Sequence, residues 1–134
     1  MTREEVSLKL RSVLESKPEV KVCLLFGSAA EGKLIAKSDI DIAICGDNAF
    51  SHDFLAELQV AITERLGREV DLLDMARLNG IILRQVITTG KKIINKKPDL
   101  LAHYIKKVLF FSEDMLPNYQ MILKAKAKRF ADGY

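Results

Sequence analysis

The stretch GSAAEGKLIAKSDIDIAIC, residues 27–45, decides the fold of this chain of 134 residues. It opens on a glycine–serine pair, Gly27 and Ser28, and it closes in a strict alternation of polar and apolar residues. Alternation with a period of two is typical of a strand that buries one face, so this closing part is predicted to be a strand. Its isoleucines share one face, while Asp39 and Asp41 share the other face at the start of the strand.

An apolar run from Val20 to Phe26 directly precedes the pair and is predicted to be another strand. If the two strands pair antiparallel, Gly27 lies beside Asp39 and Asp41 at one edge of the sheet. Glycine allows a phosphate to approach the backbone closely. Ser28 adds a hydroxyl donor, and the amides of a short helix expected directly after it would face an anion. The stretch therefore predicts a phosphate-binding turn next to two carboxylates.

The paired carboxylates favour a bound cation. The Cα atoms of Asp39 and Asp41 are expected roughly 6–7 Å apart on a strand, so their side chains can converge. Two carboxylates at about 4 Å repel by roughly 4 kcal/mol at an effective dielectric constant near 20, which exceeds the contribution of a typical hydrogen bond. Oxygen ligands favour Mg²⁺ or Mn²⁺ over zinc.

Asp71 is predicted to complete a cluster of three carboxylates, if its strand lies beside that of the aspartates with matching parity. Two metal ions about 3.5–4 Å apart could then clamp a phosphoryl transfer. Asp71 would serve both as a metal ligand and as the candidate general base. Asp74 is a nearby alternative third ligand, but strand position and parity favour Asp71.

The remaining pattern predicts an α+β fold with a small mixed sheet, helices packed mainly on one face, and a C-terminal helical extension. We expect helices at residues 3–16, 51–66, 78–89 and from 98 onward, interrupted at Pro117 and followed by a final helix to about 130. Further strands are expected at residues 68–73 and 92–95. The length suits one domain over 1–134, with a core at about 1–97 and the extension at about 98–131.

The bulk composition is that of a soluble globular protein, with 49% hydrophobic and 29% charged residues. No apolar run approaches the roughly 18 residues of a spanning helix, and the N-terminus lacks the pattern of a signal peptide, so a cytoplasmic location without a membrane is expected. The net charge of +3 does not demand nucleic acid, and direct nucleic-acid binding is not expected. Cys23 and Cys45 are predicted to be buried thiols rather than a zinc or redox pair.

Basic residues outside the motif have two open interpretations. Lys33 and Lys37, in the loop of the opening stretch, could neutralise phosphate or could simply be solvated. The runs GKKIINKK at 90–97 and KAKAKR at 124–129 fit a solvated face, or a surface for an acidic protein partner or RNA.

One pattern in this stretch resembles the signature of the nucleotidyltransferase superfamily with the DNA polymerase beta fold. It consists of Gly27-Ser28, ten further residues and then Asp39-x-Asp41. The resemblance is closest to the minimal nucleotidyltransferases. The segment EVDL at 69–72 is similar to the part of that family that carries its third carboxylate. The resemblance implies the nucleotidyltransferase fold for most of the chain.

The segment SEDMLP at 112–117 is similar to the tail of antitoxins that pair with HEPN-domain toxins. This resemblance implies an enzyme that transfers AMP from ATP to a tyrosine of a cognate HEPN-domain toxin, and so acts as an antitoxin that can assemble with that toxin.

The same resemblance implies the roles of the site residues. Gly27 and Ser28 would bind the triphosphate of ATP, and Asp39, Asp41 and Asp71 would hold Mg²⁺, as two ions, with Mn²⁺ as the alternative metal. A second interpretation is nucleotidyl transfer to a small molecule such as an aminoglycoside, although the chain is short for the extra substrate domain of such enzymes. A third is an antitoxin without catalysis that acts by binding alone.

Overall fold

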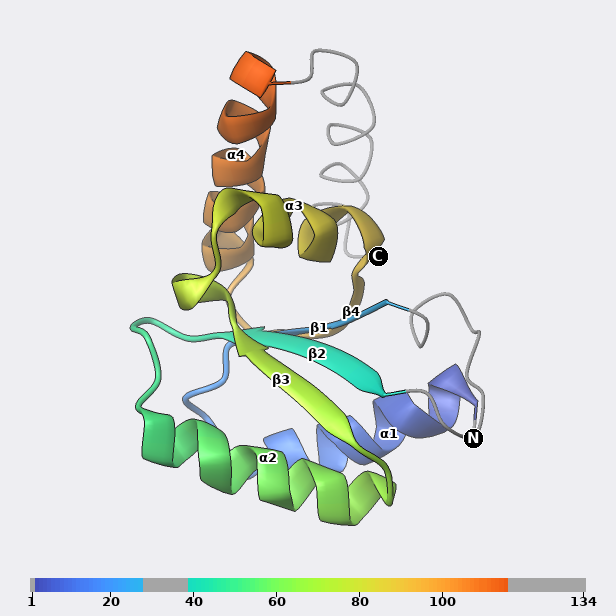
Figure 1. Cartoon of the computed structure of the whole chain (residues 1–134). Helices are drawn as coiled ribbons and strands as arrows, with labels where there is room; N and C mark the ends of the chain where they lie inside the picture. Colours follow the sequence, from blue (N-terminus) through green and yellow to red (C-terminus); the bar gives the residue numbers. More distant parts are fainter. Residues whose placement is uncertain (1, 28–38, 116–134) are drawn as a thin grey trace.

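The computed structural model describes residues 2–27 and 39–115, with side-chain surroundings up to residue 111 (Figure 1). In chain order the elements are α1 (Arg3–Leu14), β1 (Val22–Phe26), β2 (Ile40–Cys45), α2 (His52–Leu66), β3 (Val70–Asp74), the 3-10 helix η1 (Met75–Arg77), α3 (Gly80–Thr89), β4 (Lys91–Asn95) and α4 (Pro98–Met115). The predicted elements that fall on these residues are confirmed, with boundaries shifted by at most two residues. The helix expected after Ser28, the interruption at Pro117 and the final helix lie outside the described residues.

The strands form one mixed sheet in the order β3-β2-β1-β4. Strand β1 pairs antiparallel with both β2 and β4, whereas β2 pairs parallel with β3. The predicted α+β class and the antiparallel pairing of the first two strands are therefore confirmed. Helix α2 supplies the crossover that a parallel β2–β3 connection requires.

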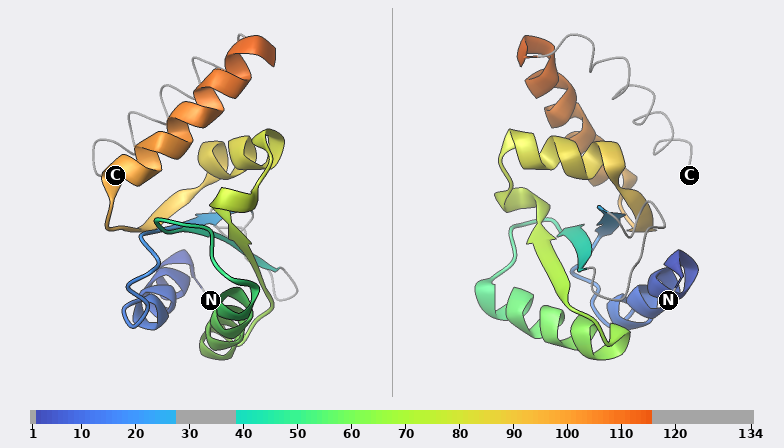
Figure 2. Two further views of the ribbon diagram at one scale, coloured as in Figure 1. Left: turned by 90° about the vertical axis from the view of Figure 1, so that its left-hand side faces the viewer. Right: turned by 45° about the vertical axis from the view of Figure 1, so that its right-hand side comes forward.

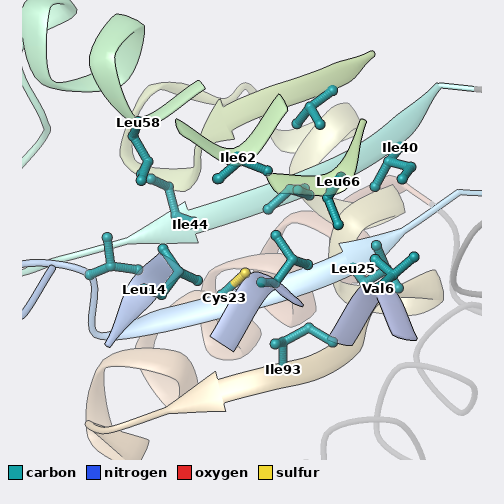
Figure 3. Close-up of a cluster of buried hydrophobic side chains, with 14 of the residues drawn as sticks. Val6, Leu14, Cys23, Leu25, Ile40, Ile44, Leu58, Ile62, Leu66 and Ile93 are labelled. Atoms are coloured by element: carbon teal, nitrogen blue, oxygen red, sulfur yellow. The ribbon is translucent and has the colours of Figure 1, made fainter. Parts of the chain in front are cut away.

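Helices cover both faces of the sheet, so the prediction that they pack mainly on one face is wrong. Helices α1 and α2 lie below the sheet and α3 and α4 lie above it in Figure 1, and the two views of Figure 2 show the same arrangement. The lower core joins the two helices to the isoleucines of β2 and to alternate residues of β1 (Figure 3). The upper core joins α3 and the first turns of α4 to Ala43 and Cys45. Strand β2 is buried on both faces along most of its length, as expected for a strand with helices on both sides of the sheet.

The helix ends follow local chemistry. Thr2 accepts a hydrogen bond from the Glu5 amide at 3.2 Å, and Ser51 and Asn79 cap α2 and α3 in the same way. Gly67 ends α2 with a φ of 68°, a left-handed conformation that favours glycine. These caps account for the agreement between the predicted and observed boundaries.

Cys23 and Cys45 are free, buried thiols, as predicted. Cys23 belongs to the lower core and Cys45 to the upper one, so the two side chains lie on opposite faces of the sheet. Burial raises the pKa of each thiol to about 12, which keeps both thiols protonated and unreactive. Of the helices in the described part of the chain, none combines the length and apolar character needed to span a membrane.

Candidate active site

The carboxylates singled out in the sequence come together at one end of the sheet. Asp41 on β2 lies directly opposite Asp71 on β3 in the parallel register, so the two side chains share the upper face. Asp39 precedes β2 by one residue and is exposed at the same end. The predicted parity of Asp71 is therefore what the structure shows.

The glycine of the glycine–serine pair lies at the same end of the sheet. Phe26, the last residue of β1, pairs with Asp41, so Gly27 follows at that carboxylate. Gly27 has a φ of 70°, which disfavours any residue with a side chain. A Cβ added to Gly27 would overlap Oδ2 of Asp41. Two independent features thus require glycine here, and both keep the backbone open beside a carboxylate.

The pKa of Asp41 reflects the nearby carboxylates at this end of the sheet. Burial raises the pKa of Asp41 above its ordinary value of 3.8, and the charges of Asp71 and then Asp39 raise it further. Asp39 and Asp71 are themselves exposed, whereas Asp41 is half-buried. The folded protein therefore holds the carboxylate of Asp41 within electrostatic range of those of Asp71 and Asp39.

We expect Asp41→Asn to raise the melting temperature of the metal-free protein at neutral pH. Because the folded-state pKa of Asp41 is raised, its protonated form stabilises the fold below pH 3.8, and that stability is lost as the pH rises through the folded pKa. The asparagine variant should thus gain on wild type at pH 7 and show no gain at pH 3, as followed by thermal melts.

Asp47→Asn provides a control of opposite sign. A hydrogen bond from Lys97 at 2.6 Å lowers the pKa of Asp47, so ionised Asp47 favours the fold above pH 3.8. Its replacement should leave the melting temperature at pH 7 unchanged or slightly lower. Equal melting temperatures of wild type and Asp41→Asn at pH 7 would contradict the crowding of the three carboxylates.

The donor set suits a hard divalent cation, since it consists of carboxylate oxygens and excludes thiols and imidazoles. The charges of Asp39 and Asp71 both act on Asp41, which is the condition that a bound cation relieves. Across residues 2–27 and 39–115 no three acidic, His or Cys side chains are drawn together closely enough to form a finished metal site. Carboxylate oxygens are the ligands that hard divalent cations prefer, but these side chains would have to turn inward to hold such an ion.

Asp74, the alternative third ligand, lies elsewhere and has another role. It pairs in register with Ile44, at the opposite end of β3 from Asp71, and it is buried. Its carboxylate accepts hydrogen bonds from the amides of Phe50 at 2.8 Å and Ala76 at 3.0 Å. Arg77 lies 3.7 Å from the same carboxylate and donates to the carbonyl of Phe50 at 2.7 Å. Asp74 therefore fastens the loop after β2 to the end of β3.

A basic groove lies near the end of β1, and it includes lysines for which the sequence left a solvated face and a partner surface open. It has a volume of about 410 Å³ between α1 and β4, and its cationic lining residues are Arg3, Arg11, Lys91 and Lys92. Lys91 pairs with Leu25, two residues before Gly27. In the sequence, Arg3 and Arg11 recur at helical spacing and two lysines lie at the start of the expected strand at 92–95. These residues indicate a groove only once α1 is known to lie beside β4.

Another cleft lies away from the carboxylates. It has a volume of about 550 Å³ and is lined by residues that include Glu19, Asp47 and Phe50. These residues precede β1 or follow β2, at the opposite end of those strands from Gly27. The carboxylates thus lie at the other end of the sheet, outside this cleft. Ser28, Lys33 and Lys37 lie outside the described residues, so their predicted contacts with phosphate stay predictions.

Comparisons with known proteins agree with this geometry. Protein adenylyltransferase MntA of Shewanella oneidensis strain MR-1 is 28% identical over 94 residues, which cover 70% of this chain and 68% of that protein. A crystal structure of a toxin–antitoxin complex with AMP-PNP has a TM-score of 0.72 at 24% identity, covering 89% of this chain and 97% of the other. A structure of a tri-AMPylated Shewanella oneidensis HEPN toxin with its MNT antitoxin has a TM-score of 0.68 at 22% identity, covering 92% and 98%.

At these identities the solved structures establish the fold. The family described as Polymerase beta, Nucleotidyltransferase matches residues 8–99, which is more than half of the chain and includes Gly27 and all three aspartates. The chain therefore belongs to the polymerase beta nucleotidyltransferase family.

Proposed function

We propose that this protein transfers AMP from ATP to a tyrosine hydroxyl of a HEPN-domain toxin and thereby acts as its antitoxin. The observation that carries the proposal is the register that sets Asp41 opposite Asp71 beside Gly27. The relative MntA, named a protein adenylyltransferase, supports the reaction. The similar complex of an MNT antitoxin with a tri-AMPylated HEPN toxin supports the acceptor.

In this reaction the acceptor oxygen attacks the α-phosphorus of ATP. The new O–P bond forms as the bond between the α-phosphorus and the bridging oxygen breaks, and pyrophosphate leaves with that electron pair. Asp71, exposed at the sheet edge, takes the hydroxyl proton as general base. The backbone at Gly27 and the hydroxyl of Ser28 bind the triphosphate.

Asp39, Asp41 and Asp71 would hold two Mg²⁺ ions, with Mn²⁺ as the alternative metal. Such an ion supplies positive charge to the phosphate oxygens, where negative charge develops during transfer.

The test combines the purified protein with labelled ATP, Mg²⁺ and the product of the neighbouring gene. Label that moves to the partner protein supports the proposal. Label that moves instead to an added aminoglycoside would support transfer to a small molecule. A partner that is inhibited without becoming labelled would leave an antitoxin that acts by binding alone.

We expect Mg²⁺ with ATP to raise the melting temperature more than ATP alone. A ligand that binds only the folded state stabilises it by RT ln(1 + [L]/Kd), about 2.7 kcal/mol at one hundred times Kd. Repulsion from the three carboxylates weakens ATP binding when no cation is present. Thermal melts with ATP, with and without Mg²⁺, check this, and equal shifts would contradict a metal-bridged triphosphate.

The proposed setting is the cytoplasm, where a reducing environment suits the free thiols Cys23 and Cys45. We further propose that residues 1–134 act as a single domain, with a core at about 1–97 and a C-terminal extension at about 98–131 that begins with α4.

A further inference from the structure

Strand β3 is an outer strand of the sheet that the described residues form (Figure 1), and Asp71 is its second residue. The amide of Ile40 donates to the carbonyl of Glu69 at 3.1 Å, which fixes the alternation of the parallel ladder. Residues in phase with Glu69, such as Asp71, direct their backbone groups to β2, so Val70 and Leu72 direct theirs outward. Gln59 confirms this phase, because its side-chain amide donates to the outward carbonyl of Val70 at 3.1 Å.

The opposite edge of the sheet is protected against strand pairing. Strand β4 carries two lysines, and two more follow it directly. Its ladder with β1 is irregular between Cys23 and Leu24, and the carbonyl of Ile93 accepts a hydrogen bond from Arg11 at 3.1 Å. Lysines and bulges are the features that keep an edge strand from pairing with another chain.

Strand β3, with the sequence VDLLD, carries no lysine and its ladder with β2 is regular. Within the described part of the chain, the outward carbonyl of Val70 is capped by the hydrogen bond from Gln59. The outward amide and carbonyl of Leu72 lie one residue beyond Asp71, next to the candidate general base. The two edges of the sheet thus differ, and the unprotected edge is the one at the site.

We propose that the acceptor segment of the partner protein binds as an extended strand along the outer edge of β3, with its main chain pairing to Leu72. This inference rests on the proposed function and adds how that acceptor is recognised. Main-chain pairing of this kind supplies affinity, while alternate side chains supply specificity. The acceptor residue opposite Asp71 then shares the upper face with it, at the separation of a cross-strand pair.

The added strand also selects the kind of hydroxyl. Neighbouring strands lie about 4.8 Å apart, so Asp41 on β2 is two strand spacings from an acceptor strand that pairs with β3. A tyrosine side chain extends over Asp71 toward Asp41, whereas a serine or threonine hydroxyl stands one bond beyond its Cβ and stays above its own strand. The exposed carboxylates of Glu69 and Asp71 favour a segment that carries basic residues beside the tyrosine.

The test is Leu72→Pro, which removes the outward amide and leaves the β2–β3 ladder intact, since proline is tolerated on edge strands when its nitrogen faces outward. We expect the affinity for the product of the neighbouring gene, measured by calorimetry without ATP, to fall about tenfold, while binding of Mg²⁺-ATP is unchanged. Leu72→Ala is the matched control, because it shortens the half-buried side chain but keeps the amide. Equal affinity of Leu72→Pro and Leu72→Ala would overturn the proposal.

Amide exchange of the wild-type protein provides a second test that needs no variant. The amide of Leu72 should exchange rapidly in the free protein and become protected by the partner, whereas the amide of Asp71 is protected in both states. Rapid exchange at Leu72 in the complex would overturn the proposal. A wild-type protein that is a dimer, and that Leu72→Pro converts to a monomer, would also overturn it, because the edge of β3 would then pair with a second copy of this chain. Partner binding that depends on Leu72 without any transfer of label would instead refute the proposed function alone.

Discussion

Asp71→Asn is expected to reduce the rate of AMP transfer by about a thousandfold or more. The amide of asparagine neither accepts the hydroxyl proton nor carries the charge that a divalent cation requires. Loss of a general base alone costs roughly 10²–10⁴-fold, and loss of a metal ligand adds to this. Because Asp71 is exposed, its replacement should change the free energy of unfolding by less than about 0.5 kcal/mol. Initial rates of label transfer at saturating Mg²⁺-ATP measure the effect.

Asp47→Asn is the matched control for this measurement. Asp47 is an exposed carboxylate that accepts a hydrogen bond from Lys97. It follows β2 and so lies at the other end of that strand from Asp41. Its replacement should leave the transfer rate within twofold of wild type. A rate within tenfold of wild type for Asp71→Asn would remove Asp71 from the role of general base.

The strands and the parity of the carboxylates followed from the sequence, because the period of two in IDIAIC assigns each side chain to a face. Asp71 was placed on the face of Asp41 by the same alternation, and the register confirms it. The face of the sheet that each helix covers did not follow. An amphipathic stripe shows that a helix has one buried side, but only the crossovers and the order of the strands decide which face of the sheet receives it.

Contacts between distant segments were the other limit. Asp74 looked like a second candidate ligand because a carboxylate near a strand end has no local mark of its role. Its partner Phe50 lies 24 residues earlier in the chain, so the hydrogen bond that makes Asp74 structural appears only in the folded protein. The basic groove between α1 and β4 is hidden for the same reason. A sequence thus predicts chemistry that is local to one strand better than chemistry that the fold assembles.

Gly27→Ala is expected to reduce AMP transfer by about a hundredfold or more while costing only about 1–2 kcal/mol of stability. The stability cost arises because alanine at a φ of 70° is strained. The larger effect on activity has another cause. The new Cβ would overlap Oδ2 of Asp41, and that carboxylate can relieve the overlap by turning away from the site. The measurements are the transfer rate and the free energy of unfolding in urea.

Gly67→Ala separates the two causes. Gly67 has a φ of 68°, almost the same conformation, but a Cβ added there meets no atom within 4 Å. Both variants should therefore lose a similar 1–2 kcal/mol of stability from backbone strain, and Gly67→Ala should keep the wild-type rate. The difference in rate between the two then reports the displacement of the Asp41 carboxylate alone. If Gly27→Ala transfers AMP as fast as Gly67→Ala, the position of the Asp41 carboxylate is not what the reaction depends on.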